Sequence, residues 1–293
     1  MRLDAQCILC LLKRHSQTAS DIGSEEQVTA FVRDLMRLLC EGPVEMSAPY
    51  YVPEISKLFT EHFGLAEDRF AAEKEASNRY ALERLDKLTD MVRTAPDPLY
   101  AGLQAAILGN YIDFSALQGE VSFEKLDEML ELLHTIEVDR ETFAALRSDL
   151  ERGRELLYLT DNAGEIVFDR VWLEVIRDLF PNLAITVCVR GGPAQNDATM
   201  ADAQAVGMPF RVIGNGTRIP GTVLELASAE LKAALSAADV IIAKGQANVE
   251  TLLDTGHGCN IYYAFLVKCQ RFIDRFGKEK LTPMLVRDIQ EAI

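Results

Sequence analysis

Positive charge is scarce in this sequence. Its 293 residues include 30 Lys and Arg against 45 Asp and Glu, which gives a formal net charge of −15 at pH 7. Proteins that bind nucleic acids need a basic face, so this balance argues against a nucleic-acid partner. The same acidity repels anionic substrates at long range, and a phosphate site must therefore supply its own cation or oriented amides.

Long apolar runs are also missing. The longest extends over residues 261–267, far short of the ~18 residues that a membrane-spanning helix requires. The N-terminal segment has a short apolar core, but no small-residue cleavage site follows it. We therefore expect a cytoplasmic protein with no membrane partner, and the sequence leaves its oligomeric state open.

Cysteine and histidine are few. The six cysteines are too sparse for a disulfide scaffold, and none of the four histidines forms a His-x-x-x-His pair. A Gly-x-Ser-x-Gly nucleophile elbow and a Walker A phosphate loop are absent, which excludes ATP hydrolysis by the P-loop route. The pair Cys7 and Cys10 suits either a metal or redox site or two core thiols on one helix face, and Cys269 is a third thiol that we hypothesise to join them.

Two patterns divide the chain. Up to residue 152 the apolar residues recur at helical spacing, which predicts an all-helical domain over residues 1–152. From there on, short apolar runs alternate with helical segments, which predicts an α/β domain over residues 153–293 with a doubly wound, mostly parallel sheet. The runs are almost continuously apolar, as expected for strands buried on both faces. The expected strands are residues 155–160, 183–189, 210–213, 239–243 and 260–267.

Polar loops that contain glycine follow three of these strands. In open parallel sheets, ligands bind outside the carboxyl ends of the strands, so these loops are expected to meet at one edge. Asp161, Asn162 and Asp197 offer carboxylate and amide oxygens there, which are the ligands that Mg²⁺ and Mn²⁺ prefer. The three loops are residues 160–165, 190–197 and 244–248.

Each of these features has a plainer interpretation. Asp161, Asn162 and Asp197 also suit helix capping. Lys244 follows a buried apolar run, where an unpaired cation is costly, and it predicts either a bound phosphate or an ion pair with an acidic loop. The meeting of two acidic loops and one lysine at a single edge favours a phosphoester site, in which a divalent ion polarises the phosphoryl oxygens. Direct attack by water and a phosphoenzyme on Asp161 both stay open.

A family resemblance rests on four motifs taken together. They are Asp161-Asn162-Ala163-Gly164-Glu165, Asn196-Asp197, Lys244-Gly245-Gln246-Ala247-Asn248 and Gly109-Asn110-x-x-Asp113-Phe114. In this combination the chain resembles the DUF89 family of metal-dependent damage-control phosphatases, over nearly its whole length. The pair Cys7 and Cys10 is similar to the Cys-x-x-Cys of the prokaryotic and archaeal branch.

The resemblance implies a Rossmann-like, mostly parallel sheet with helices on both faces and an N-terminal all-helical domain that acts as a cap. It implies hydrolysis of small phosphorylated metabolites, either sugar phosphates or damaged phosphometabolites, with Mg²⁺, Mn²⁺, Co²⁺ or Ni²⁺ as the cofactor. By motif position, the metal ligands are Asp161, Asn162 and Asp197, the catalytic residues are Asp161, Asn162 and Glu165, and the substrate-binding residues are Asn110, Asp113, Lys244 and Asn248. Glu165 would support the metal shell or position water.

Two other functions use the same crevice. An S-adenosylmethionine-dependent carboxyl methyltransferase is the alternative enzyme, although its cofactor calls for a glycine-rich first loop and this loop contains only Gly164. A non-catalytic sensor of metal or phosphometabolites needs the same binding residues, and only turnover separates it from a hydrolase. A haloacid-dehalogenase-type phosphatase does not match, because that family has a second Asp where this chain has Ala163.

Overall fold

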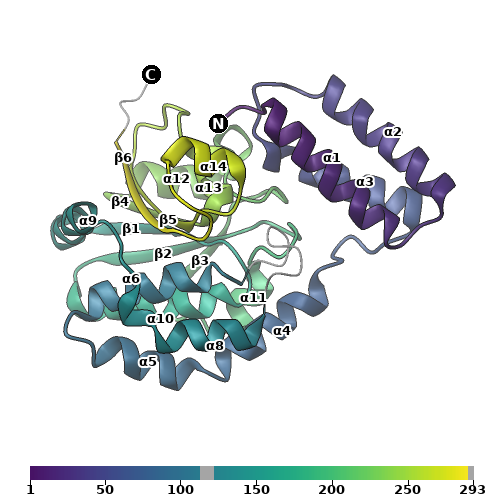
Figure 1. Ribbon diagram of the computed structural model, residues 1–293. Helices are drawn as coiled ribbons and strands as arrows, with labels where there is room; N and C mark the ends of the chain where they lie inside the picture. The colour runs from purple at the N-terminus through teal and green to yellow at the C-terminus, as the bar shows by residue number, and fades with distance from the viewer. Residues whose placement is uncertain (113–121, 290–293) are drawn as a thin grey trace.

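The computed structural model describes residues 1–112 and 122–289. Its described part contains a six-stranded sheet with strand order β3-β2-β1-β4-β5-β6 (Figure 1). The strands from β3 to β5 are parallel, and β6 is antiparallel to β5, which confirms the predicted Rossmann-like sheet. The strands are β1 (Glu155–Leu159), β2 (Ala184–Val189), β3 (Arg211–Gly214), β4 (Val240–Lys244), β5 (Asn260–Leu266) and β6 (Pro283–Ile289).

The last strand has no counterpart among the predicted ones. β6 lies at the edge of the sheet and begins at Pro283, a residue that cannot donate a ladder hydrogen bond. Only Leu285 of this strand is buried, and its neighbours are partly or fully exposed. A strand with one open face lacks the continuous apolar run that identifies the buried parallel strands, so a search for such runs does not find it.

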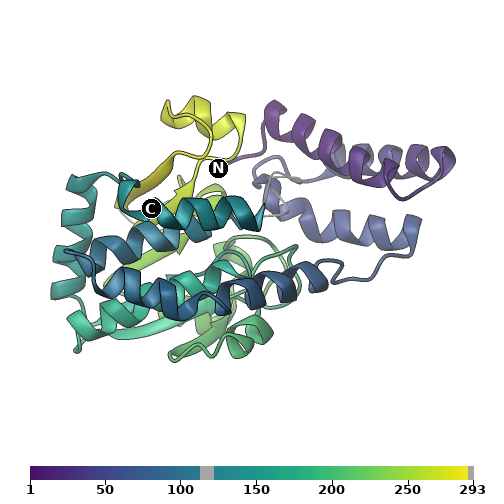
Figure 2. The same ribbon diagram turned by 60° about the horizontal axis from the view of Figure 1, so that its bottom comes forward.

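Helices cover both faces of the sheet (Figure 1, Figure 2). Successive residues of β1 point into different layers: Leu156 and Tyr158 join one hydrophobic cluster, and Leu157 and Leu159 join the other. The first cluster includes residues of α4 (Ala71–Leu82), α5 (Leu85–Arg93), α6 (Pro98–Gly109), α8 (Phe123–Glu131), η2 (Leu133–Thr135), α9 (Arg140–Arg152), α10 (Glu165–Leu179) and α11 (Met200–Ala205). The second includes residues of α12 (Ala229–Ala237), α13 (Gly245–Leu252) and α14 (Gln270–Phe276), with η3 (Leu224–Leu226) packed against it.

The N-terminal helices have a hydrophobic core of their own. In both views α1 (Ala5–Ser20), α2 (Glu25–Glu41) and α3 (Val52–Phe63) lie to one side of the sheet, with the short helix η1 (Ala48–Tyr51) before α3. Buried residues such as Phe31 and Phe59 join these helices. The later helices share their core with the sheet instead. The boundary between residues 152 and 153 stays a prediction.

α6 positions a polar residue at the edge of the sheet. This helix is buried on all sides, and two glycines let it approach α10 closely: a Cβ on Gly102 would lie 2.4 Å from Trp172, and one on Gly109 would lie 3.0 Å from Phe168. Asn110 is the C-cap of this helix; it is fully buried and contacts Asp161 in the loop after β1. Close helix packing thus carries Asn110 to the carboxyl ends of the strands.

No helix in residues 1–112 or 122–289 is long and apolar enough to cross a membrane.

Candidate active site

The loops after β1 and β2 are joined directly. Asn162 and Asp197 form an isolated antiparallel bridge, and the Ala198 N–H donates to the backbone oxygen of Asp161 at 2.7 Å. The helix cap after β1 is Gly164, which makes no side-chain cap bond, and the cap of α11 is Thr199. Asp161, Asn162 and Asp197 are therefore not the cap residues of these helices, and all three are at least 96% buried.

These three side chains line one cavity of about 410 Å³. Residues of α1, η1 and α3 line the same cavity, so the N-terminal helices border the edge of the sheet at this point. Four basic side chains line the same cavity: Lys13, Arg14, Lys268 and Arg271. The cavity thus combines oxygen donors with basic side chains, in a protein whose overall charge is strongly negative.

Two side-chain amides hold the carboxylate of Asp161. Its Oδ2 accepts hydrogen bonds from Asn162 Nδ2 at 2.8 Å and from Asn110 Nδ2 at 2.9 Å. Gly245, with φ +76°, packs against this oxygen: a Cβ on Gly245 would lie 1.9 Å from Asp161 Oδ2. The glycine of the Lys244-Gly245 pair is therefore required both by its left-handed backbone and by the carboxylate beside it.

Glu165 orients both amides without lining the cavity. Its Oε2 accepts from Asn110 Nδ2 at 2.9 Å, from Asn162 Nδ2 at 2.8 Å and from the Asn162 backbone N–H at 3.3 Å. The contact to the N–H three residues earlier resembles half of a capping box. Glu165 is fully buried, so its carboxylate acts on the site through Asn110 and Asn162.

Lys244 forms an ion pair with buried carboxylates, which is the alternative to a bound phosphate that the sequence left open. Its ammonium donates to Glu165 Oε1 at 2.5 Å and to the backbone oxygen of Ala106 at 2.7 Å, and it lies 3.3 Å from Asp169 Oδ1. Burial by itself lowers the pKa of Lys244, but the carboxylates of Asp169 and Glu165 outweigh it and raise this pKa above its usual value. The side chain is fully buried and is not among the residues that line the cavity.

The other predicted substrate-binding residues lie in different places. Asn248 is fully buried and donates to the backbone oxygens of Thr160 and Lys244 at 3.1 and 2.7 Å, while its own oxygen accepts from Thr222 Oγ1 at 2.9 Å. It therefore ties α13 to the end of β1. Asn110 donates hydrogen bonds to Asp161 and Glu165. Asp113 lies outside the residues that the structure describes.

Arg190 holds the second carboxylate. Its Nε donates to Asp197 Oδ2 at 2.6 Å, its Nη2 donates to the backbone oxygen of Thr160 at 3.0 Å, and the same Nη2 lies 3.7 Å from Asp161 Oδ1. Arg190 is 1% exposed. Its position at the end of β2 supplies a fixed positive charge between the two acidic residues.

Gln195 and Lys268 are among the cavity residues that were not predicted from the sequence. Gln195 lines the cavity with φ +54°, an uncommon backbone for this residue type, and its Nε2 is buried without a hydrogen-bond partner within the described ranges. Lys268, which is 6% exposed, follows the predicted strand 260–267 as Lys244 follows the predicted strand 239–243. The rule that placed Lys244 at the sheet edge, a lysine directly after an apolar strand, would also have found Lys268.

Comparison with known proteins identifies the family. The family model of the damage-control phosphatase ARMT1-like domain matches residues 3–282. The chain belongs to this family. A crystal structure of a DUF89 family protein from Pyrococcus horikoshii matches 100% of both chains, with a TM-score of 0.79 and 26% sequence identity. The DUF89 resemblance of the sequence is thereby confirmed.

Two archaeal relatives are named damage-control phosphatases. A damage-control phosphatase of Archaeoglobus fulgidus is 29% identical over 284 residues, 92% of this chain and 93% of that protein. One of Pyrococcus horikoshii is 38% identical over 170 residues, 57% of each chain. An uncharacterised protein of Methanocaldococcus jannaschii is 30% identical over 286 residues, 94% of this chain and 92% of that protein. The named relatives support hydrolase activity for this ARMT1-like domain.

Three thiols of this ARMT1-like domain border the cavity. Cys7, Cys10 and Cys269 all line it, and all three are free cysteines. Arg271 Nη1 lies 3.1 Å from Cys7 Sγ, and burial raises the pKa of Cys7 to about 12, which disfavours the thiolate. Among the described residues, no group of three or more His, Cys, Asp or Glu side chains is arranged to hold a metal ion.

The raised pKa of Asp169 predicts how the stability of this DUF89 protein changes with pH. Burial, with Glu165 nearby, raises its pKa to about 7, although Lys244 acts in the opposite direction. The folded protein then keeps a proton that the unfolded chain releases near the ordinary value of 3.8, so this contribution to stability is lost as the pH rises from about 4 to about 7. Urea titrations across this range should show the wild type weakening relative to Asp169→Asn. A difference that is constant with pH would contradict the assignment.

Proposed function

We propose that this protein is a metal-dependent phosphatase that hydrolyses phosphoric monoesters of small metabolites. The observation that carries the proposal is the cavity that Asp161, Asn162 and Asp197 line together with Lys268 and Arg271. Oxygen donors suit a hard divalent cation, and basic side chains suit the phosphate that such a cation binds. The family and the named relatives support the same activity.

The donor chemistry fits the proposed cofactor. Asp161 and Asp197 are carboxylates, Asn162 adds an amide oxygen, and each belongs to the oxygen class that Mg²⁺, Mn²⁺, Co²⁺ and Ni²⁺ accept. Because only two of the three are acidic, the set depends on the orientation of the Asn162 amide. When bound, the ion would polarise phosphoryl oxygens and lower the pKa of a bound water.

The chain's own residues keep this donor set rigid. Asn110 and Glu165 fix the side chains of Asp161 and Asn162 by hydrogen bonds of 2.8 to 2.9 Å. Arg190 fixes Asp197 at 2.6 Å. Since all of these groups are buried, they need no reorganisation when a substrate binds, which is how fixed dipoles and charges favour a transition state.

We assign substrate recognition to cavity residues outside the proposed metal-binding set. Lys268 and Arg271 would offset phosphate charge, and the Gln195 amide would donate to a phosphoryl oxygen. A volume of about 410 Å³ suits a small molecule and not a macromolecule. We therefore assign the substrate to small phosphorylated metabolites, namely sugar phosphates or damaged phosphometabolites.

Phosphate release from metal-stripped protein tests the proposal. The protein is reloaded separately with Mg²⁺, Mn²⁺, Co²⁺ and Ni²⁺ and assayed on a panel of sugar phosphates and nucleotides. We expect release only in the presence of metal, because the three protein oxygens alone would repel the phosphate. Binding of phosphoesters without release would favour the sensor, and methyl transfer from S-adenosylmethionine without phosphate release would favour the methyltransferase.

A further inference from the structure

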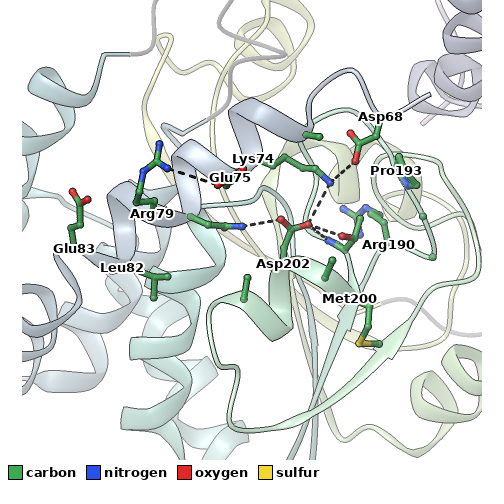
Figure 3. Close-up of a pocket in the computed structure, with 17 residues that line it drawn as sticks. Asp68, Lys74, Glu75, Arg79, Leu82, Glu83, Arg190, Pro193, Met200 and Asp202 are labelled. Carbon is green, nitrogen blue, oxygen red and sulfur yellow. Dashed lines mark hydrogen bonds and ion pairs between the residues drawn. The ribbon is translucent and has the colours of Figure 1, made fainter. Parts of the chain in front are cut away.

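Helix α4 packs against α10 and α11, the helices that follow the two loops with the proposed metal ligands. Figure 3 shows Lys74 of α4 reaching toward Asp202 of α11, and the Lys74 ammonium lies 3.5 Å from Asp202 Oδ2. Asn78 lies four residues further along α4 and is 6% exposed. The proposed metal-binding and substrate-binding residues include none from this helix, so its buried polar side chains have no assigned role.

The side-chain oxygen of Asn78 holds the loop after β1. Asn78 Oδ1 accepts a hydrogen bond from the Gly164 N–H at 2.7 Å. Gly164 has φ +78°, and a Cβ there would lie 2.7 Å from Ser77 Cβ, so this turn fits against α4 only with glycine at its position. Because Gly164 comes two residues after Asn162, the contact with Asn78 fixes the loop close to two of the proposed ligands.

The side-chain nitrogen of Asn78 holds the helix after the second loop. Asn78 Nδ2 donates to Asp202 Oδ1 at 2.9 Å. Asp202 Oδ2 accepts from the backbone N–H of Thr199 at 2.9 Å and from its hydroxyl at 2.6 Å, in the capping box that begins α11. Thr199 comes two residues after Asp197, so these hydrogen bonds lead from Asn78 to the loop of the third proposed ligand.

Asn78 therefore connects the two ligand loops through a single side chain. A cation bound by Asp161, Asn162 and Asp197 needs oxygens from both loops at a suitable separation. The bridge between Asn162 and Asp197 sets part of this separation, and Asn78 adds a constraint from outside the cavity. Mutation of groups that orient metal ligands without binding the metal typically changes metal affinity or activity by about 10–100-fold.

We propose that Asn78 is a positioning residue of the phosphatase site, which sets the distance between the two ligand loops. This inference rests on the proposed function, because the ligands on these loops are those of the proposed metal site. Asn78 does not line the candidate active site, and it acts through Gly164 and Asp202. Its loss should weaken metal binding in a protein that is still folded, whereas loss of a purely structural residue should lower stability alone.

Three variants test this role. Asn78→Leu removes both hydrogen bonds at a similar side-chain size. Tyr100→Phe is the matched control: Tyr100 is 4% exposed, its hydroxyl accepts from the Val138 N–H at 2.9 Å and donates to the Val138 backbone oxygen at 3.2 Å, and it does not line the candidate active site. The combined variant Asn78→Asp with Asp202→Asn exchanges acceptor and donor, so both contacts of residue 78 can form again.

The dissociation constant of Mn²⁺ is measured by titration, and urea unfolding measures the stability of each variant. We expect Mn²⁺ to bind at least about tenfold more weakly to Asn78→Leu than to the wild type. Tyr100→Phe should lose stability but keep the wild-type affinity for Mn²⁺. The combined variant should bind Mn²⁺ more tightly than Asn78→Asp alone, because in the single variant two carboxylates face each other.

Unchanged Mn²⁺ affinity in Asn78→Leu, or an equal loss in Tyr100→Phe, would overturn the inference and leave the proposed function in place. If Asn78→Leu does not fold, Asn78→Asp and the combined variant decide, and equal affinities in these two would overturn the inference. A wild type that binds no Mn²⁺ would count against the proposed function.

Hydrogen exchange of residues 161–167 in the metal-free protein separates the two questions. We expect faster exchange in Asn78→Leu than in the wild type and in Tyr100→Phe, because the Gly164 N–H loses its acceptor. Unchanged exchange in Asn78→Leu would show that Asn78 does not hold the loop, whatever the result with Mn²⁺.

Discussion

Asp161→Asn is expected to lower metal-dependent phosphate release by at least about a thousandfold, which corresponds to about 4 kcal/mol of transition-state stabilisation. The substitution removes one of only two carboxylates in the proposed donor set and keeps the size of the side chain. It also keeps one oxygen that can accept from Asn110, so the fold should survive. The measurement is kcat/KM for the best substrate at saturating metal, together with Mn²⁺ affinity by titration.

Asp86→Asn is the matched control, because Asp86 is an exposed carboxylate on α5 that does not line the cavity. It should leave both kcat/KM and Mn²⁺ affinity unchanged. Retention of more than about a tenth of the activity by folded Asp161→Asn, against the several kcal/mol expected of a bound metal, would remove Asp161 from the proposed machinery. Equal loss in both variants would point to a general electrostatic effect instead.

Lys244→Met is expected to lower the free energy of unfolding by about 3–5 kcal/mol, the range for breaking a buried ion pair on one side. The substitution leaves Glu165 and Asp169 buried without the ammonium that both carboxylates contact. Urea unfolding at neutral pH measures the loss. The deficit should shrink at acidic pH, where protonation of Asp169 removes part of the uncompensated charge.

Lys57→Met provides the surface comparison for this prediction. The Lys57 side chain is 65% exposed and pairs with Glu54, which is 50% exposed, so its loss should change stability by less than about 1 kcal/mol. Adding Glu165→Gln to Lys244→Met should restore part of the lost stability, since one buried charge is then removed. A Lys244→Met loss no larger than that of the control would show that the ion pair does not support the fold.

The local sequence predicted five strands of the sheet but not the edge strand β6. Strands β1, β2, β4 and β5 are each buried on both faces, so their apolar runs stand out without any knowledge of their neighbours. The apolar pattern also continues from α4 into α5, although the helix is interrupted at Glu83 and Arg84, where no proline or glycine marks the break. An edge strand and a helix break without proline or glycine both depend on the tertiary contacts of the segment.

The acidic residues of the site could be located for the same reason. Asp161, Asn162 and Asp197 directly follow or lie near the ends of adjacent parallel strands, and strand order places those ends together. The contacts of Glu165 could be predicted only in part. Its spacing of three residues from Asn162 suggests a contact, but the sequence does not show that it also binds Asn110 and Lys244.

The sequence by itself determined the α/β class, the family and the meeting of the acidic loops, because each depends on local periodicity or on motifs close in sequence. Only the tertiary structure decided the partner of Lys244, since a buried ammonium takes whichever carboxylates packing brings to it, here Glu165 and Asp169 of α10. It also decided which cations face the cavity. Arg14 and Lys268 lie 254 positions apart in the sequence, and only the packing of α1 over the sheet edge brings them to one cavity.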